Sequence, residues 1–205
     1  MLSRFTKILV IGLGKLGLTV IKYVKESGFD VYGYDIKTKA IDRAEKIAEI
    51  KHAVDFVSED FNVFIISVST NQPDNIFPPQ IEGLLSTVNK ISNEAKKECA
   101  LGSIESIIPK GTSKKVFEIL NHRFHVVHSG HRWYSLDEKE QGVNQLHVIG
   151  GVGDCCLKAG MQYYGVTEEE IYFDITPFSY NSLGIPRHSA SNIEIAEITK
   201  IRTAI

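Results

Sequence analysis

The chain has 205 residues, of which 43% are hydrophobic and 23% charged, and its formal net charge is −2. This is the composition of an ordinary globular protein, long enough for one sizeable domain with a small appendage. The near-neutral charge offers no basic surface to a nucleic acid. No apolar stretch reaches the ~18–20 residues that span a bilayer. We therefore expect a cytoplasmic protein with no nucleic-acid or membrane partner.

Short β-branched runs alternate along the chain with segments of helical period. Strands are expected at 7–11, 30–35, 62–69, 99–106, 124–129, 145–151 and 171–176, and helices at 15–28, 38–50, 81–97, 111–120 and 153–165. This alternation predicts an α/β fold, a doubly wound and mostly parallel Rossmann sheet. A loop over 177–190 separates it from a final helix that begins near Ser191, and we expect that helix to leave the domain.

The segment VIGLGKLG carries Gly12, Gly14 and Gly17 in a GxGxxG pattern, directly between an expected strand and an expected helix. Gly12 allows the tight turn, Gly14 lets the backbone approach a pyrophosphate, and Gly17 lets the helix pack closely on the strand. The helix start, at Lys15 and Leu16, offers N–H groups and partial positive charge to the phosphates. In this context the pattern predicts a dinucleotide site rather than glycines that merely close a turn.

Asp35 ends the second expected strand, 23 residues after Gly12. Its carboxylate can accept both hydroxyl groups of the adenosine ribose and would repel a 2′-phosphate, which favours NAD over NADP. Lys37, close by, argues in the other direction. FAD is a further alternative, although a flavoprotein normally needs more chain to enclose its ring system. We take NAD as the expected cofactor.

Four later motifs resemble the N-terminal, NAD-binding domain of the UDP-glucose/GDP-mannose dehydrogenase family. They are FIISVST, ESIIPKGT, VIGG and AEITK, and with the glycine motif they extend the resemblance from about residue 6 to about residue 202. Enzymes of this family oxidise a nucleotide sugar twice with NAD, from alcohol to acid. The resemblance implies an NAD-dependent dehydrogenase acting on a CH–OH group, whose small-molecule substrate is a nucleotide sugar or another anionic alcohol.

The resemblance also implies roles for individual residues. Ser69, Thr70 and Glu105 would lie beside the cofactor, because ligands of such sheets bind outside the carboxyl ends of the strands. Lys200 falls in the segment that supplies the family's catalytic lysine, a cation that stabilises developing oxyanions. The alternative for Lys200 is a solvated lysine on a helix surface.

The chain departs from the family's pattern at several positions. Ile107 stands where the family has a threonine that hydrogen-bonds a catalytic water, and Ala204 stands at the position of an asparagine. The family's nucleophilic cysteine lies in a C-terminal nucleotide-sugar domain, which does not follow here. We expect either a fragment or a naturally short relative with altered chemistry, and the substitutions favour the second. A catalytically degenerate NAD(H) sensor or partner subunit is the alternative function.

Four histidines, His122, His125, His128 and His131, recur at every third position. A zinc site needs three or four ligands that converge on one point. Strand side chains alternate between the two faces of a sheet, so in the expected strand His125 would point away from His122 and His128. The spacing therefore does not predict a metal site.

His131 differs from the other histidines because it would lie just beyond a strand's carboxyl end, at the position of an acid/base glutamate of the family. A histidine can still move protons near neutral pH. We hypothesise that His131 is a replacement general base and that Arg132 binds an anionic substrate. A loop histidine packed on Trp133 or Tyr134 is the alternative.

The three cysteines, Cys99 and the adjacent pair Cys155 and Cys156, have no CxxC spacing. An odd count with this spacing predicts reduced, mostly buried thiols and neither a disulfide framework nor a zinc knuckle. None of the three matches the family's nucleophile motif.

The final helix carries an apolar stripe of Ile195, Ile198 and Ile201. If the helix projected alone, this stripe would be exposed, which is costly for a soluble monomer. We place the NAD-binding domain at 1–185 and a C-terminal linker helix at 186–205, and we predict a homodimer built on that helix. Packing of the helix on its own domain is the alternative.

Overall fold

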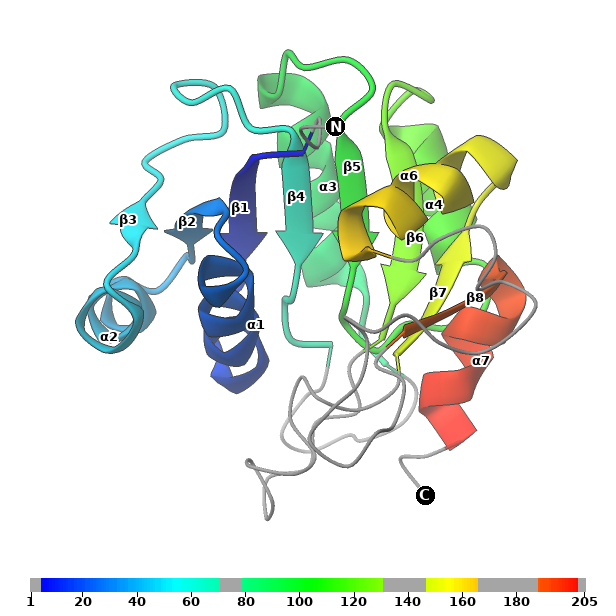
Figure 1. Ribbon diagram of the computed structural model, residues 1–205, viewed down its shortest axis with the longest axis horizontal. Helices are drawn as coiled ribbons and strands as arrows, with labels where there is room; N and C mark the ends of the chain where they lie inside the picture. The colour runs from blue at the N-terminus through cyan, green and yellow to red at the C-terminus, as the bar shows by residue number, and fades with distance from the viewer. Residues whose placement is uncertain (1–4, 71–78, 131–146, 166–187, 203–205) are drawn as a thin grey trace.

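The computed structural model describes residues 5–70, 79–130, 147–165 and 188–202, and every structural statement below concerns these residues. They form one eight-stranded sheet with helices on both faces (Figure 1). The strands are β1 (Lys7–Ile11), β2 (Asp30–Tyr34), β3 (Lys51–His52), β4 (Val63–Ile66), β5 (Leu101–Ile104), β6 (His125–Ser129), β7 (His147–Gly151) and β8 (His188–Asn192). The helices are α1 (Lys15–Glu26), α2 (Thr38–Ala48), α3 (Glu82–Glu94), α4 (Thr112–Ile119), α6 (Asp154–Tyr164) and α7 (Ile193–Arg202).

The sheet has the order β3-β2-β1-β4-β5-β6-β7-β8. The six neighbouring strands from β3 to β6 in this order, which include β2, β1, β4 and β5, pair in parallel. Strand β7 runs antiparallel to β6, and β8 runs parallel to β7. The chain builds outward from β1 in one direction to β2 and β3, and then in the other direction from β4. The order therefore reverses at β1 and β4, and ligands of open α/β sheets bind at such a reversal. The predicted doubly wound Rossmann fold is confirmed.

Each face of the sheet has its own hydrophobic core, and β4 shows how one strand serves both. Val63 and Ile65 pack with side chains of α1, α2 and α6, whereas Phe64 and Ile66 pack with those of α3 and α4. All four residues are buried. The unbroken apolar run around β4 is thus explained by a central parallel strand covered on both faces.

The elements differ from the sequence-based expectation mainly near the sheet edges. The two-residue strand β3 was not expected, because Lys51 and His52 are exposed and carry no apolar signal. Residues 188–192 were assigned to a loop and a helix start, but they form β8 beside β7. The expected strand at 171–176 lies outside the described residues. No helix among the described residues is long and apolar enough to cross a membrane.

The described part of α7 packs on the sheet instead of leaving the domain. Ile193, Ala196 and Glu197 are buried, and α7 lies against β6 and β7. The Glu197 carboxylate accepts the Gly111 and Ser113 N–H groups at 2.6 and 2.8 Å. This carboxylate therefore satisfies N–H groups at the start of α4, where the helix dipole favours a negative charge.

The apolar stripe expected on α7 is only partly covered. Ile195 and Ile198 are 50% and 36% exposed. The side chains of Ile201 and Lys200 lie outside the described set. One side of α7 therefore packs on the domain, while apolar side chains on another side remain exposed.

Candidate dinucleotide site

The glycine turn between β1 and α1 has the tight geometry that the motif predicts. Gly12 has φ +92°, and its N–H donates to the Tyr34 carbonyl oxygen at 2.9 Å. A Cβ at Gly12 would lie 2.7 Å from the Ser67 carbonyl oxygen, and one at Gly17 would lie 1.8 Å from the Gly12 carbonyl oxygen. Side chains at Gly12 and Gly17 are therefore excluded by the protein's own backbone.

Gly14, in contrast, is not required by packing within the domain. It precedes α1 in extended conformation, and a Cβ there would meet no described atom within 4 Å. No described side chain caps the start of α1, and the first turn holds no acidic residue. The helix start is thus open to an anion, which its N–H groups and dipole would favour.

Asp35 is held against the glycine turn by two backbone hydrogen bonds. Its carboxylate accepts the Leu13 N–H at 2.7 Å and the Lys37 N–H at 2.8 Å. The Arg43 guanidinium donates to the Leu13 carbonyl oxygen at 2.8 Å. Both polar backbone groups of Leu13 are therefore fixed, and the carboxylate faces the turn at the point where an adenosine ribose would lie.

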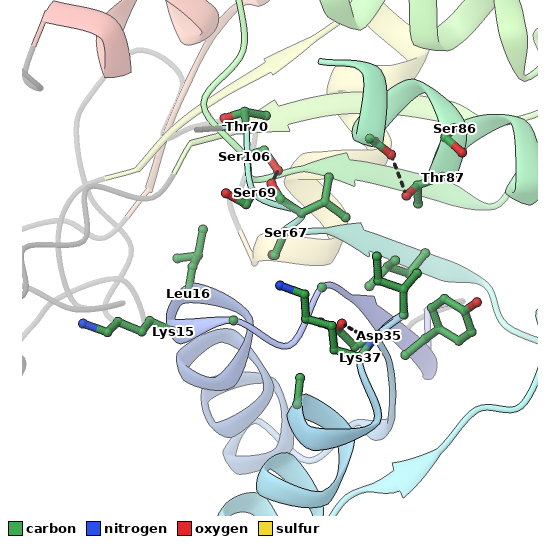
Figure 2. A pocket seen from close by; sticks show the side chains of 18 of the residues that line it. Lys15, Leu16, Asp35, Lys37, Ser67, Ser69, Thr70, Ser86, Thr87 and Ser106 are labelled. Carbon is green, nitrogen blue, oxygen red and sulfur yellow. Dashed lines mark hydrogen bonds between the residues drawn. The ribbon is translucent and has the colours of Figure 1, made fainter. Parts of the chain in front are cut away.

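A cavity of about 970 Å³ opens in front of this turn, between the ends of β1, β2 and β4 and helix α3 (Figure 2). Its volume is at the upper end of the range found for ligand sites, roughly 300–1,000 Å³. The predicted site residues in its wall are Gly12, Gly14, Lys15, Leu16, Asp35, Ser69 and Thr70. Gly17 lies behind the turn, packed on Gly12.

Glu105 does not lie in this wall. Its side chain is 1% exposed, and the Tyr164 hydroxyl donates to its carboxylate at 2.9 Å. The same hydroxyl lies 2.7 Å from Ser103 Oγ. Burial, followed by the nearby Glu105 charge, raises the pKa of Tyr164 well above its ordinary value. The structure thus places Glu105 in an internal polar network between β5 and α6.

Several cavity residues were not anticipated from the sequence. Ser67 is 7% exposed, and its Oγ makes no hydrogen bond to any described residue. Buried hydroxyls are normally paired, so this one fits a ligand or water in the cavity. Lys39 and Arg43, from α2, add positive charge beside Asp35. The weak signal for Ser67 was its place two residues before Ser69, at the end of the same strand.

The described structure does not test the predicted catalytic residues. His131 and Arg132, like Trp133 and Tyr134, lie outside the described residues. Lys200 lies in α7, but its side chain is not described. Ile107 is in the cavity wall, so an apolar group stands where the family has a threonine.

The histidines and cysteines have distinct surroundings. His125 is partly exposed, whereas His128, three residues along β6, is completely buried. His122 precedes the strand and stacks on Phe117 with ring centroids 4.4 Å apart. The expectation of mostly buried thiols is wrong, because Cys99 and Cys155 are exposed and only Cys156 is buried.

The sheet is mostly parallel, and its strand order reverses at β1. With a glycine turn open to an anion and a carboxylate after β2, these features define a Rossmann-type dinucleotide-binding domain. Residues 7–131 match the family model described as the NAD binding domain of 6-phosphogluconate dehydrogenase, and the chain belongs to this family. Its cofactor is therefore NAD, as predicted.

The chain is similar to curated relatives and solved structures that are nucleotide-sugar dehydrogenases. The chain is 30% identical over 189 residues to the UDP-N-acetyl-D-mannosamine dehydrogenase of Methanococcus maripaludis, covering 81% of this chain and 44% of that protein. The structure of the UDP-D-ManNAc dehydrogenase of Pyrococcus horikoshii aligns with a TM-score of 0.70 at 23% identity, over 96% of this chain and 49% of that one. The corresponding Staphylococcus aureus enzyme gives a TM-score of 0.71 at 20% identity, over 97% and 50%.

These likenesses confirm the resemblance inferred from the motifs and the fold. The chain spans about half the length of the curated relatives that it matches, 44% for the Methanococcus maripaludis protein. The structures, at less than 25% identity, bear on the fold alone.

Proposed function

We propose that this chain is an NAD-binding oxidoreductase that acts on the CH–OH group of a nucleotide sugar or another anionic alcohol. The observation that carries the proposal is the open start of α1 beside the fixed Asp35 carboxylate, in one cavity. Bound NAD would supply a hydride acceptor. The relatives named above are UDP-N-acetyl-D-mannosamine dehydrogenases, which supports the substrate class.

Different residues of the cavity would bind different parts of the cofactor. The N–H groups at the start of α1 would bind the pyrophosphate, which approaches over Gly14. Asp35 would accept the adenosine ribose hydroxyls, since each carboxylate oxygen has acceptor capacity beyond its backbone hydrogen bond. Ser67 Oγ would gain the partner that it lacks among the described residues. Ser69 and Thr70, after β4, would contact the nicotinamide half.

A second candidate function, a sensor or partner subunit that binds NAD(H) without chemistry, is favoured by one observation. Ile107 lines the cavity with an apolar side chain, which cannot hydrogen-bond a catalytic water. The two functions share the cofactor site, and they differ in whether a substrate is oxidised there.

The test measures NADH formation by absorbance with UDP-N-acetylmannosamine, UDP-glucose and GDP-mannose as substrates. In parallel, calorimetry measures NAD binding to the same protein. The oxidoreductase proposal expects NAD binding and NADH formation with at least one of these sugars. NAD binding without any NADH formation would favour the sensor. Absence of NAD binding would overturn both.

His131→Ala is expected to abolish turnover and to leave NAD affinity within about twofold of the original. The reason is that a general base removes the substrate's hydroxyl proton and does not hold the dinucleotide; its loss typically costs about 10²–10⁴ in rate. Arg132→Ala should mainly raise the KM of the anionic substrate. Unchanged turnover in His131→Ala would discard the assignment, and lost NAD binding would show a different role for this residue.

We further propose a homodimer that buries the exposed part of α7. Exposed apolar side chains at Ile195 and Ile198 support it, because their burial against a second copy would be favourable. Sedimentation at micromolar concentration tests this: a mass of twice 22.9 kDa is expected, and a monomeric mass contradicts the proposal.

A further inference from the structure

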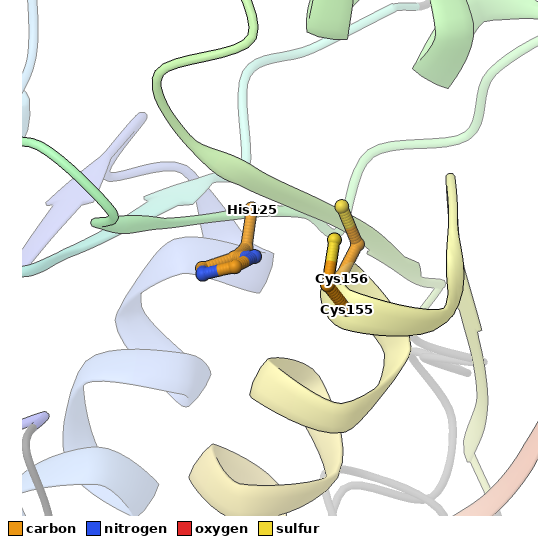
Figure 3. Close-up of side chains that lie close together, drawn as sticks. All are labelled: His125, Cys155 and Cys156. Carbon is orange, nitrogen blue, oxygen red and sulfur yellow. The ribbon is translucent and has the colours of Figure 1, made fainter.

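Three potential metal ligands lie close together outside the NAD cavity (Figure 3). They are the imidazole of His125, at the start of β6, and the thiols of Cys155 and Cys156, in the first turn of α6. One ligand atom from each residue lies within 4.8 Å of the others. The cavity lies at the carboxyl ends of the parallel strands, whereas His125 lies at the amino end of β6, so the two sites are separate.

The topology of the sheet explains why residues 30 positions apart meet here. Strand β7 runs antiparallel to β6, with Gly151 opposite Val127, and the Val152 N–H donates to the Val126 carbonyl oxygen at 3.1 Å. The chain therefore ends β7 beside the start of β6 and enters α6 three residues later. This turn brings Cys155 and Cys156 next to His125.

The ligand set suits zinc in type and nearly suits it in distance. Zinc binds thiolates at ~2.3 Å and imidazole at ~2.0–2.1 Å, so tetrahedral ligand atoms lie roughly 3.4–3.8 Å apart. The present spread of up to 4.8 Å requires shifts of about 1 Å. Cys155 is exposed and His125 partly exposed, whereas Cys156 is 1% exposed and packed in the core.

Two other roles for this cluster fit less well. A disulfide between Cys155 and Cys156 is disfavoured, because adjacent Cα atoms lie about 3.8 Å apart and disulfides need about 4.4–6.8 Å. A reactive Cys156 is disfavoured because its side chain is only 1% exposed, whereas reactive cysteines are partly exposed.

We propose that His125, Cys155 and Cys156 form a zinc site that links the start of α6 to β6. Three protein ligands would hold the ion and leave its fourth coordination position to water. The buried Cys156 anchors the ion to the core. The site lies at the amino end of β6, away from the cofactor cavity, so the ion would link β6 to α6 and take no part in cofactor binding.

The test is titration of the reduced, metal-free full chain with Co²⁺ and then Zn²⁺. One equivalent of Co²⁺ should give a thiolate-to-metal charge-transfer band and the visible bands of a tetrahedral site, and Zn²⁺ should displace it. Zn²⁺ should also raise the melting temperature. No thiolate band at micromolar protein, or a six-coordinate spectrum without thiolate, would overturn the proposal.

Matched variants locate the site. Cys155→Ser and His125→Gln should weaken Co²⁺ binding by at least about 10-fold, since even outer residues of metal sites cost this much. Cys99→Ser removes the other exposed thiol and should bind Co²⁺ as the original protein does. Equal binding by Cys155→Ser, or an equal loss in Cys99→Ser, would contradict the assignment. NAD affinity, measured on each variant, serves as the check that the domain is folded.

Discussion

Gly14→Val is expected to abolish NAD binding and to leave the domain folded. A Cβ at this position meets no described atom within 4 Å, so the added Cβ creates no clash with the described residues. The branched side chain would instead fill the space over the start of α1 that the pyrophosphate must enter. We expect NAD affinity to fall by at least about 100-fold, which corresponds to ~2.8 kcal/mol. Calorimetry measures the affinity and thermal unfolding measures the fold.

Gly153→Val is the matched control for this variant. Gly153 also precedes a helix in extended conformation, and a Cβ there also meets no described atom within 4 Å, but it precedes α6 and does not line the cavity. It should keep NAD affinity. Gly17→Ala, unlike Gly14→Val, should destabilise the fold of the domain, because its Cβ would lie 1.8 Å from the Gly12 carbonyl oxygen. Normal NAD affinity in Gly14→Val would contradict this account of the turn.

Asp35→Ser is expected to convert a preference for NAD into a preference for NADP. The carboxylate that would accept the ribose hydroxyls and repel a 2′-phosphate is removed, while Lys37, Lys39 and Arg43 remain in the cavity wall. Hydrogen bonds to charged groups are worth about 1.5–3 kcal/mol, so losing one for NAD and gaining one for NADP should change the affinity ratio by at least about 100-fold. Parallel titrations with both dinucleotides measure this ratio.

The control for Asp35→Ser must separate charge from structure. Asp35 accepts two backbone N–H groups, and losing them costs stability by itself. Asp55→Ser loses a similar pair, from Val57 and Ser58, on an exposed loop outside the cavity wall. It should lower the melting temperature slightly and leave the affinity ratio unchanged. An unchanged ratio in Asp35→Ser would show that this carboxylate does not select the cofactor.

The parts of the site that the sequence predicted are those set by local backbone. The glycine spacing is a local signal, because a Cβ at Gly17 would meet the Gly12 carbonyl oxygen of the same turn, and Asp35 is predicted by its place directly after β2. The position of Ser67 in the wall depends on pairing of β4 with β1, which no local pattern encodes. Glu105 was placed by resemblance, and its side chain instead faces α6, because strand alternation sends it to that side of the sheet.

The cluster of His125 with Cys155 and Cys156 shows what periodicity cannot predict. The histidine repeat relates residues that are close in sequence, but their side chains alternate between the two faces of the sheet. The residues that do approach His125 arrive through the antiparallel return of β7, a tertiary event. Likewise, the packing of α7 depends on a contact between Glu197 and the start of α4. Its partner Ser113 lies 84 residues earlier in the sequence.

The most direct test of the central claim is a crystal structure of this protein with NAD bound. The account predicts the pyrophosphate on the N–H groups at the start of α1, above Gly14, and the adenosine ribose hydroxyls on the Asp35 carboxylate. A dinucleotide bound elsewhere, or a ribose that leaves Asp35 without contact, would contradict it.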